Sequence, residues 1–113
     1  MITVAIIGAG IGEQHLKGYK ALPDLFTVKA LCDLDLDRAR LVAGEDKSIA
    51  LHEDSKAVLD DPSIDLIDIC LPPHLHFDGA LAALEAGKHV VCEKPLVRSV
   101  AEVDLLIDAA ART

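Results

Sequence analysis

Short apolar runs alternate with amphipathic segments along the whole chain. The runs are of strand length and rich in Val, Ile and Leu, which is typical of strands buried on both faces of a parallel sheet. We expect such strands at residues 2–7, 26–32, 49–51, 65–71 and 88–92.

The segments between these runs have the spacing of helices with one apolar face. Predicted helices cover residues 13–22, 36–43, 54–60 and 74–86, and a last helix follows Ser99. Asp35 is a candidate N-cap for the second helix, while Gly44 and Gly87 are candidate C-terminal stops.

Ser99 and Glu102 have the spacing of a capping box, which marks the start of the last helix. Its apolar side chains are predicted to share one face, formed by Val100, Val103, Leu106, Ile107 and Ala110.

Strands and helices that alternate with short connections form parallel sheets with right-handed crossovers. We therefore predict an α/β fold: a doubly wound parallel sheet of the Rossmann type, with strand order 3-2-1-4-5 and one domain over residues 1–113. The binding crevice of such a sheet lies at the C-terminal ends of its strands, where strands 1 and 4 diverge.

Composition narrows the possible partners and surroundings. The chain has 113 residues and is 51% hydrophobic, which suits one packed core. Its formal net charge of −8 would repel phosphate backbones, so we expect no nucleic-acid partner.

No apolar run has the length of a membrane span, and the N-terminus lacks a basic leader, so we expect a cytoplasmic protein. The three cysteines are widely spaced and are expected to be reduced and buried.

A glycine-rich turn follows the first predicted strand. In Gly8-Ala9-Gly10-Ile11-Gly12, the glycines allow the backbone to turn tightly and to approach a pyrophosphate, and the next helix directs free N–H groups at it. The commoner fingerprint places its third glycine one residue later, where this chain has Glu13. The position of the turn between strand and helix favours dinucleotide binding over a simple connection.

An acidic residue, Asp33, follows the second predicted strand. A carboxylate there accepts hydrogen bonds from the adenosine ribose hydroxyls and repels a 2′-phosphate, which favours NAD over NADP. The alternatives for Asp33 are a helix N-cap or a solvated strand end, and Asp35 competes for the cap. Arg38 is close enough to alter the preference, but we interpret it as a helix-surface residue.

Two prolines follow the fourth predicted strand, in Leu71-Pro72-Pro73-His74. They stiffen a turn beside the expected dinucleotide, where backbone groups can line the cofactor. His74 and His76 are two residues apart and diverge in a helix, so we expect no metal site there. Helix capping or contact with the edge of the cofactor is the better interpretation of His76.

Glu93-Lys94-Pro95 follows the fifth predicted strand. A lysine at the crevice can donate a hydrogen bond to a substrate hydroxyl or carbonyl and take part in its proton transfer. Glu93 can hold Lys94 or contact the cofactor. Without further context, a surface Glu-Lys pair in an ordinary turn is the favoured interpretation.

With these motifs in place, the chain resembles the Gfo/Idh/MocA family of sugar and inositol oxidoreductases. The resemblance extends over the whole chain and is most specific from Ala83 to Leu96, which includes Gly87-Lys88-His89 and Glu93-Lys94-Pro95. Leu31-Cys32-Asp33 and the segment from Asp68 to His76 also match the family.

The resemblance implies hydride transfer between a nicotinamide dinucleotide and a hydroxyl-bearing carbon of a sugar, inositol or related polyol. It implies that Lys94 is catalytic. It also implies a set of cofactor-binding residues: Gly8, Gly10, Ile11, Gly12, Asp33, Leu71, Pro72, Pro73, His76, Glu93 and Lys94. The family's second, C-terminal substrate domain is absent from these residues, so we expect this chain alone to bind NAD without turnover.

Two other interpretations remain open at this stage. One is a non-catalytic NAD-binding module, with a homo-oligomer formed through the open sheet edge beyond the fifth strand. The other is a different Rossmann enzyme class similar to dihydrodipicolinate reductase or homoserine dehydrogenase, against which the Glu93-Lys94-Pro95 run argues.

Overall fold

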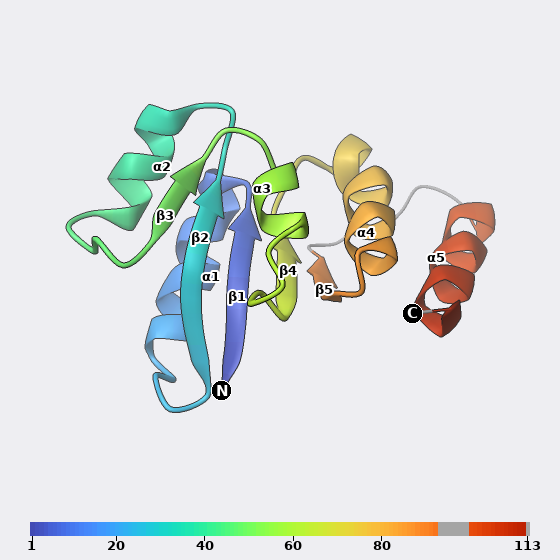
Figure 1. Ribbon diagram of the computed structural model, residues 1–113. Coiled ribbons are helices and arrows are strands. Elements are labelled where there is room, and N and C mark those ends of the chain that lie inside the picture. The colour runs from blue at the N-terminus through green and yellow to red at the C-terminus, as the bar shows by residue number, and fades with distance from the viewer. Residues whose placement is uncertain (93–99, 113) are drawn as a thin grey trace.

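The computed structural model describes residues 1–92 and 100–112. Strands and helices alternate along the chain (Figure 1). The strands are β1 (Ile2–Ile7), β2 (Phe26–Cys32), β3 (Ala50–His52), β4 (Leu66–Ile69) and β5 (His89–Cys92). The helices are α1 (Ala9–Lys20), α2 (Leu36–Ala43), α3 (Lys56–Leu59), the 3-10 turn η1 (Pro73–Leu75), α4 (His76–Glu85) and α5 (Val100–Arg112).

All strand pairs are parallel, and the strand order is β3-β2-β1-β4-β5, as the sequence predicts. β1 lies at the centre, where Ile6 faces Leu31 of β2 and Asp68 of β4. β3 and β5 are the outer strands of the described sheet. The C-terminal ends of β1, β2 and β4 therefore meet at one edge.

Apolar residues cover both faces of the sheet, because successive side chains of a strand point to opposite sides. Val4 and Ile6 of β1 pack with α1 and α2 on one face. Ala5 and Ile7 pack with Val58 of α3 and Ala83 of α4 on the other. β1 contributes residues to both clusters. Its C-terminal end, where the glycine-rich turn begins, is therefore held by packing on both faces of the sheet.

The predicted boundaries are wrong at α1. The helix covers Ala9–Lys20 rather than 13–22, so the glycine-rich segment is its first turn. Gly8 leaves the strand with a φ of 103°, and the N–H of Ala9 is already bound by a carboxylate. A partner outside the helix thus allows it to begin at once, despite the low helix propensity of glycine.

Smaller shifts occur elsewhere. The segment predicted as a helix from residue 74 begins with η1 and becomes an α-helix only at His76, because the N–H groups of Leu75 and His76 donate to carbonyl oxygens three residues back. α3 is shorter than predicted, β3 lies one residue later, and β4 ends at Ile69. Asp35 does cap α2, where its side chain accepts from the N–H of Arg38.

The predicted apolar face of α5 is partly wrong. Leu106 and Ala109 are buried, but Ile107 is 62% exposed and Ala110 is exposed as well. α5 lies at the end of the row of elements and packs mainly against α4 (Figure 1), so only a narrow stripe is covered. Ser99 of the predicted capping box lies outside the described residues.

The described helices include no segment with the length and apolar character needed to cross a membrane.

Candidate functional site

A cavity of about 710 Å³ lies at the C-terminal ends of β1, β2 and β4. This volume is in the range of small-molecule and cofactor sites. Its wall combines four segments that are separate in the sequence: the glycine-rich turn, the end of β2 with the start of α2, the loop after β3, and the turn after β4. The cavity therefore lies where the strand order of the sheet reverses, as predicted.

Two glycines of the turn are required by close packing. A Cβ on Gly8 would lie 2.5 Å from the carbonyl oxygen of Cys70, and the positive φ of Gly8 disfavours any side chain. A Cβ on Gly12 would lie 2.8 Å from Cγ2 of Ile6. Gly12 thus allows α1 to pack close to β1. In the common fingerprint the third glycine has this role, and it stands one residue later, at the position of Glu13.

Gly10 has a different environment. The nearest atom to a Cβ at this position is Nη1 of Arg38 at 3.9 Å, so packing does not exclude a side chain. Gly10 and Ile11 line the cavity, in the first turn of α1, where backbone N–H groups have no partner within the helix. This turn offers an anion both N–H donors and the positive end of a helix dipole.

Asp33 lies directly after β2 and is 8% exposed. Its Oδ2 accepts from the N–H of Ala9 at 2.8 Å, and its Oδ1 accepts from the N–H of Asp35 at 2.8 Å. It therefore connects the glycine-rich turn to the start of α2. The N-cap of α2 is Asp35, so the alternative in which Asp33 caps that helix is wrong.

Arg38 lies on the surface of α2, as predicted, but it also pairs with Asp33, which the sequence analysis did not predict. Its Nη2 donates to Oδ2 of Asp33 at 2.9 Å and its Nε donates to the same oxygen at 3.2 Å, while the side chain remains 55% exposed. The cause is its position in the first turn of α2, which directs a long side chain back toward the end of β2. An arginine five residues after the acid was the signal available in the sequence.

The surroundings of Asp33 set its charge. Burial raises the pKa of Asp33, but the N–H groups of Ala9 and Asp35 and the guanidinium of Arg38 lower it by more. The net result is a pKa below the ordinary value, so the carboxylate is charged at neutral pH. A charged acceptor with an exposed, movable partner is suited to bind a vicinal diol.

The turn after β4 forms the opposite wall. Leu71, Pro72, Pro73 and His76 line the cavity. His76 is 1% exposed, and its Nε2–H donates to the carbonyl oxygen of Leu71 at 2.6 Å. This bond closes the turn from inside, so His76 shapes the wall that the prolines stiffen.

Glu93 and Lys94, the predicted cofactor contact and catalytic lysine, lie outside the described residues. The cavity also includes residues that the sequence analysis did not assign to it, namely Ile7, Cys32, Leu34, Asp35, Glu53, Ser55, Cys70 and Leu75. Most of these adjoin a predicted strand end, and they are brought together only by the order of the strands.

The comparisons with known proteins agree with this geometry. Residues 2–113 match the family model GFO_IDH_MocA, described as an oxidoreductase family with an NAD-binding Rossmann fold. The chain belongs to this family. The predicted family, fold class and dinucleotide cofactor are thus confirmed at the level of the family.

Relatives extend the comparison. Levoglucosan dehydrogenase of Pseudarthrobacter phenanthrenivorans is 36% identical over 120 residues, which cover 96% of this chain and 30% of the relative. Myo-inositol 2-dehydrogenase of Thermotoga maritima is 31% identical over 108 residues, which cover 95% and 32%. The chain thus spans about a third of the length of these relatives.

Solved structures show the same domain with either nicotinamide cofactor. A 3-ketoreductase from Actinomadura kijaniata, in complex with NADP and TDP-benzene, superposes with a TM-score of 0.88 at 31% identity, and the match covers 98% of this chain and 34% of that one. Levoglucosan dehydrogenase in complex with NADH gives a TM-score of 0.84 at 34% identity, covering 97% and 32%.

Proposed function

We propose that the cavity binds a nicotinamide dinucleotide, with the pyrophosphate at the first turn of α1 and the adenosine ribose at Asp33. The observation that carries the proposal is the hydrogen bond from Ala9 to Asp33, which holds the two subsites in one unit. Leu71, Pro72, Pro73 and His76 line the remaining wall on the side of β4.

NAD is the preferred cofactor in this proposal. The guanidinium of Arg38 is exposed and can turn away from Asp33. The two hydroxyls of an unmodified ribose can then take its place as hydrogen-bond donors to the Asp33 carboxylate. A 2′-phosphate would meet the buried carboxylate, and repulsion would offset what Arg38 contributes to binding that phosphate. The 3-ketoreductase structure with NADP makes NADP the competing cofactor to measure.

The reaction we propose is hydride transfer between the nicotinamide and a hydroxyl-bearing carbon of a sugar, inositol or related polyol. The names of two relatives, a levoglucosan dehydrogenase and a myo-inositol 2-dehydrogenase, support this class of substrate. Lys94 is the residue we assign to proton transfer at the substrate. These relatives are about three times as long as this chain, and we propose that the other contacts with the substrate come from a region equivalent to their additional sequence.

Partners and surroundings follow from charge and cysteine chemistry. With a formal net charge of −8, the chain is not suited to nucleic acid, and small metabolites are the partners we propose. Cys32 and Cys70 are buried thiols rather than disulfide partners, which suits a reducing, cytoplasmic compartment. A second copy of the chain is a candidate to cover β5, where Val91 is 41% exposed.

A fluorescence titration tests the binding proposal. The chain has no tryptophan, so NADH emission can be followed without background from that residue. Replacing Asp33 by Asn removes a charged acceptor and is expected to weaken NADH binding about tenfold to a hundredfold. Asp37→Asn is the matched control, because Asp37 is exposed on α2 and pairs with Arg40 instead. Equal affinity of the two variants would refute the role of Asp33, and no NADH binding by the unaltered chain would refute the proposal.

A further inference from the structure

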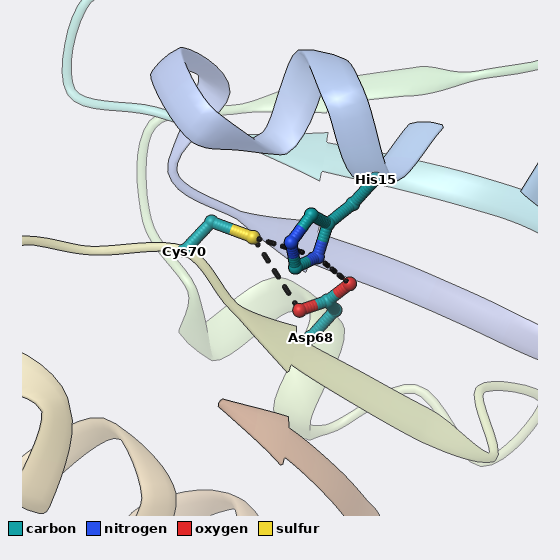
Figure 2. A group of neighbouring side chains, drawn as sticks. All are labelled: His15, Asp68 and Cys70. Carbon is teal, nitrogen blue, oxygen red and sulfur yellow. Dashed lines mark hydrogen bonds and ion pairs between the residues drawn. The ribbon is translucent and has the colours of Figure 1, made fainter. Parts of the chain in front are cut away.

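Three side chains with metal-binding atoms meet beneath the glycine-rich turn (Figure 2). His15 extends from α1, Asp68 lies on β4, and Cys70 follows the end of that strand. Nδ1 of His15 lies 2.6 Å from Oδ2 of Asp68, and Sγ of Cys70 lies 3.4 Å from Nδ1 of His15 and 3.4 Å from Oδ1 of Asp68. The carboxylate of Asp68 thus contacts His15 through Oδ2 and Cys70 through Oδ1, and one donor atom from each residue lies within 4.8 Å of the other two.

The cluster is buried but accessible from one side. Asp68 is 0% exposed and Cys70 is 6% exposed, whereas the side chain of His15 is 22% exposed. Tyr19 donates from its hydroxyl to Oδ2 of Asp68 at 2.7 Å. Within residues 1–92 and 100–112, no lysine or arginine pairs with Asp68, and His15 is its one basic partner.

We propose that His15, Asp68 and Cys70 bind one divalent transition-metal ion of the zinc class. Zinc forms bonds of about 2.3 Å to sulfur and about 2.0–2.2 Å to nitrogen and oxygen, so tetrahedral ligands lie about 3.4–3.6 Å apart. Both contacts of the Cys70 sulfur already have this spacing. The contact between His15 and Asp68 widens by about 0.8 Å when the imidazole exchanges its hydrogen bond for a metal bond.

Charge balance supports the same conclusion. A thiolate, a carboxylate and a neutral imidazole together carry two negative charges, which one divalent ion neutralises, so the occupied cluster is neutral inside the protein. The proton of the Cys70 thiol passes to solvent as the metal enters, and His15 binds through Nδ1 as the neutral tautomer with its hydrogen on Nε2. A mixed sulfur, nitrogen and oxygen donor set favours zinc and cobalt over magnesium and calcium, which prefer oxygen alone.

The surroundings complete the site. The hydroxyl of Tyr19 orients the Asp68 carboxylate, as groups hydrogen-bonded to metal ligands commonly do. A water molecule is the fourth ligand in this proposal. A metal here joins α1 to β4 directly below the cavity, because Cys70 also lines its wall. The site is distinct from the dinucleotide contacts at Asp33, and its ligands were not apparent from the sequence because they lie 53 and 55 residues apart.

Cobalt is the probe for the test, since a thiolate bonded to Co²⁺ produces a charge-transfer absorption in the near ultraviolet. Tag-free protein is titrated with Co²⁺ in the absence of dinucleotide. We expect one equivalent to bind with this absorption and with the visible intensity of a tetrahedral site, and one equivalent of Zn²⁺ to displace it. Cys70→Ser should abolish the absorption, and His15→Gln should weaken binding at least tenfold.

Cys92→Ser and His89→Gln are the matched controls, because neither residue belongs to the cluster, and Cys92 packs against the apolar residues on the other face of the sheet. Absorption that persists in Cys70→Ser, or that disappears in Cys92→Ser, would overturn the proposal. X-ray absorption at the zinc edge of the unaltered protein provides a second test that requires no variant. One sulfur among nitrogen and oxygen ligands is expected, and a shell without sulfur would mean that the three residues form only a hydrogen-bonded network.

Discussion

The carboxylate of Asp33 accepts a hydrogen bond from the backbone N–H of Ala9 at 2.8 Å. This bond joins the end of β2 to the first turn of α1. The residue proposed to bind the ribose therefore also holds the turn proposed to bind the pyrophosphate. A change at Asp33 is expected to alter both subsites and the stability of the fold.

Acid should reveal the structural part of this role. The pKa of Asp33 is lower in the folded chain than its ordinary value, so its contribution to stability is complete above the unfolded pKa and is lost as the pH falls through the folded one. The difference in melting temperature between the unaltered chain and Asp33→Asn should therefore be largest near neutral pH and shrink below about pH 4. Thermal unfolding followed by circular dichroism measures it, and a difference that stays constant down to acid pH would contradict this explanation.

Removing Arg38 should sharpen cofactor selectivity. In Arg38→Ala, Asp33 loses the competing guanidinium but keeps its backbone donors, so NADH affinity should be retained or rise. NADPH loses the nearby cation, and the ratio of the two affinities should shift toward NADH by about tenfold. Arg40→Ala is the control, since Arg40 pairs with the exposed Asp37. A ratio unchanged in Arg38→Ala would show that Arg38 has no part in selecting the cofactor.

Gly8→Ala should be far more damaging than a similar change at another glycine with positive φ. The new methyl group would lie 2.5 Å from the Cys70 carbonyl oxygen, whereas a methyl group on Gly87 meets nothing within 4 Å. We expect Gly87→Ala to cost about 1–2 kcal/mol from its backbone conformation alone. Gly8→Ala should cost at least about 3 kcal/mol, since overpacking adds to the strain. Denaturant unfolding gives both values, and similar costs would argue against the close approach of Gly8 to β4.

Much of the fold was predictable because its signals are local. Apolar runs of strand length identify β1, β2 and β5, and Asp35 with Gly44 brackets α2. The start of α1 was not predictable in this way, because it depends on the Asp33 carboxylate reaching Ala9 across 24 positions of sequence. Propensity alone places glycines outside a helix.

The candidate site shows the same division. The glycine-rich turn and Asp33 were identified from spacing, since the motif itself encodes the turn and the strand end. Arg38 was placed correctly on the helix surface, but its pairing with Asp33 was not foreseen, because that partner is set by the geometry of the α2 N-terminus. His15, Asp68 and Cys70 could not be grouped from the sequence, because only the pairing of β1 with β4 brings them together beneath α1.

The catalytic role proposed for Lys94 is tested by turnover of the natural gene product. Lys94→Ala should lower turnover about a hundredfold to ten-thousandfold, the range of a lost general acid or base, with NADH affinity nearly unchanged. Lys17→Ala is the control, because Lys17 is an exposed residue of α1 that pairs with Glu13. Steady-state kinetics on a panel of sugars and inositols, with the cofactor titrated separately, provides the readout. Turnover equal to that of the control would remove Lys94 from the mechanism.

Mapping amide chemical shifts upon NADH addition to the ¹⁵N-labelled chain is the most direct test of the central claim. The account predicts saturable shifts concentrated at Gly10, Ile11 and Gly12 of the first turn of α1, at Asp33, and at Leu71. It also predicts that Asp33→Asn reduces them at equal NADH concentration while Asp37→Asn does not. Absence of saturable shifts, or shifts concentrated away from the cavity, would contradict the claim that this cavity is the dinucleotide site.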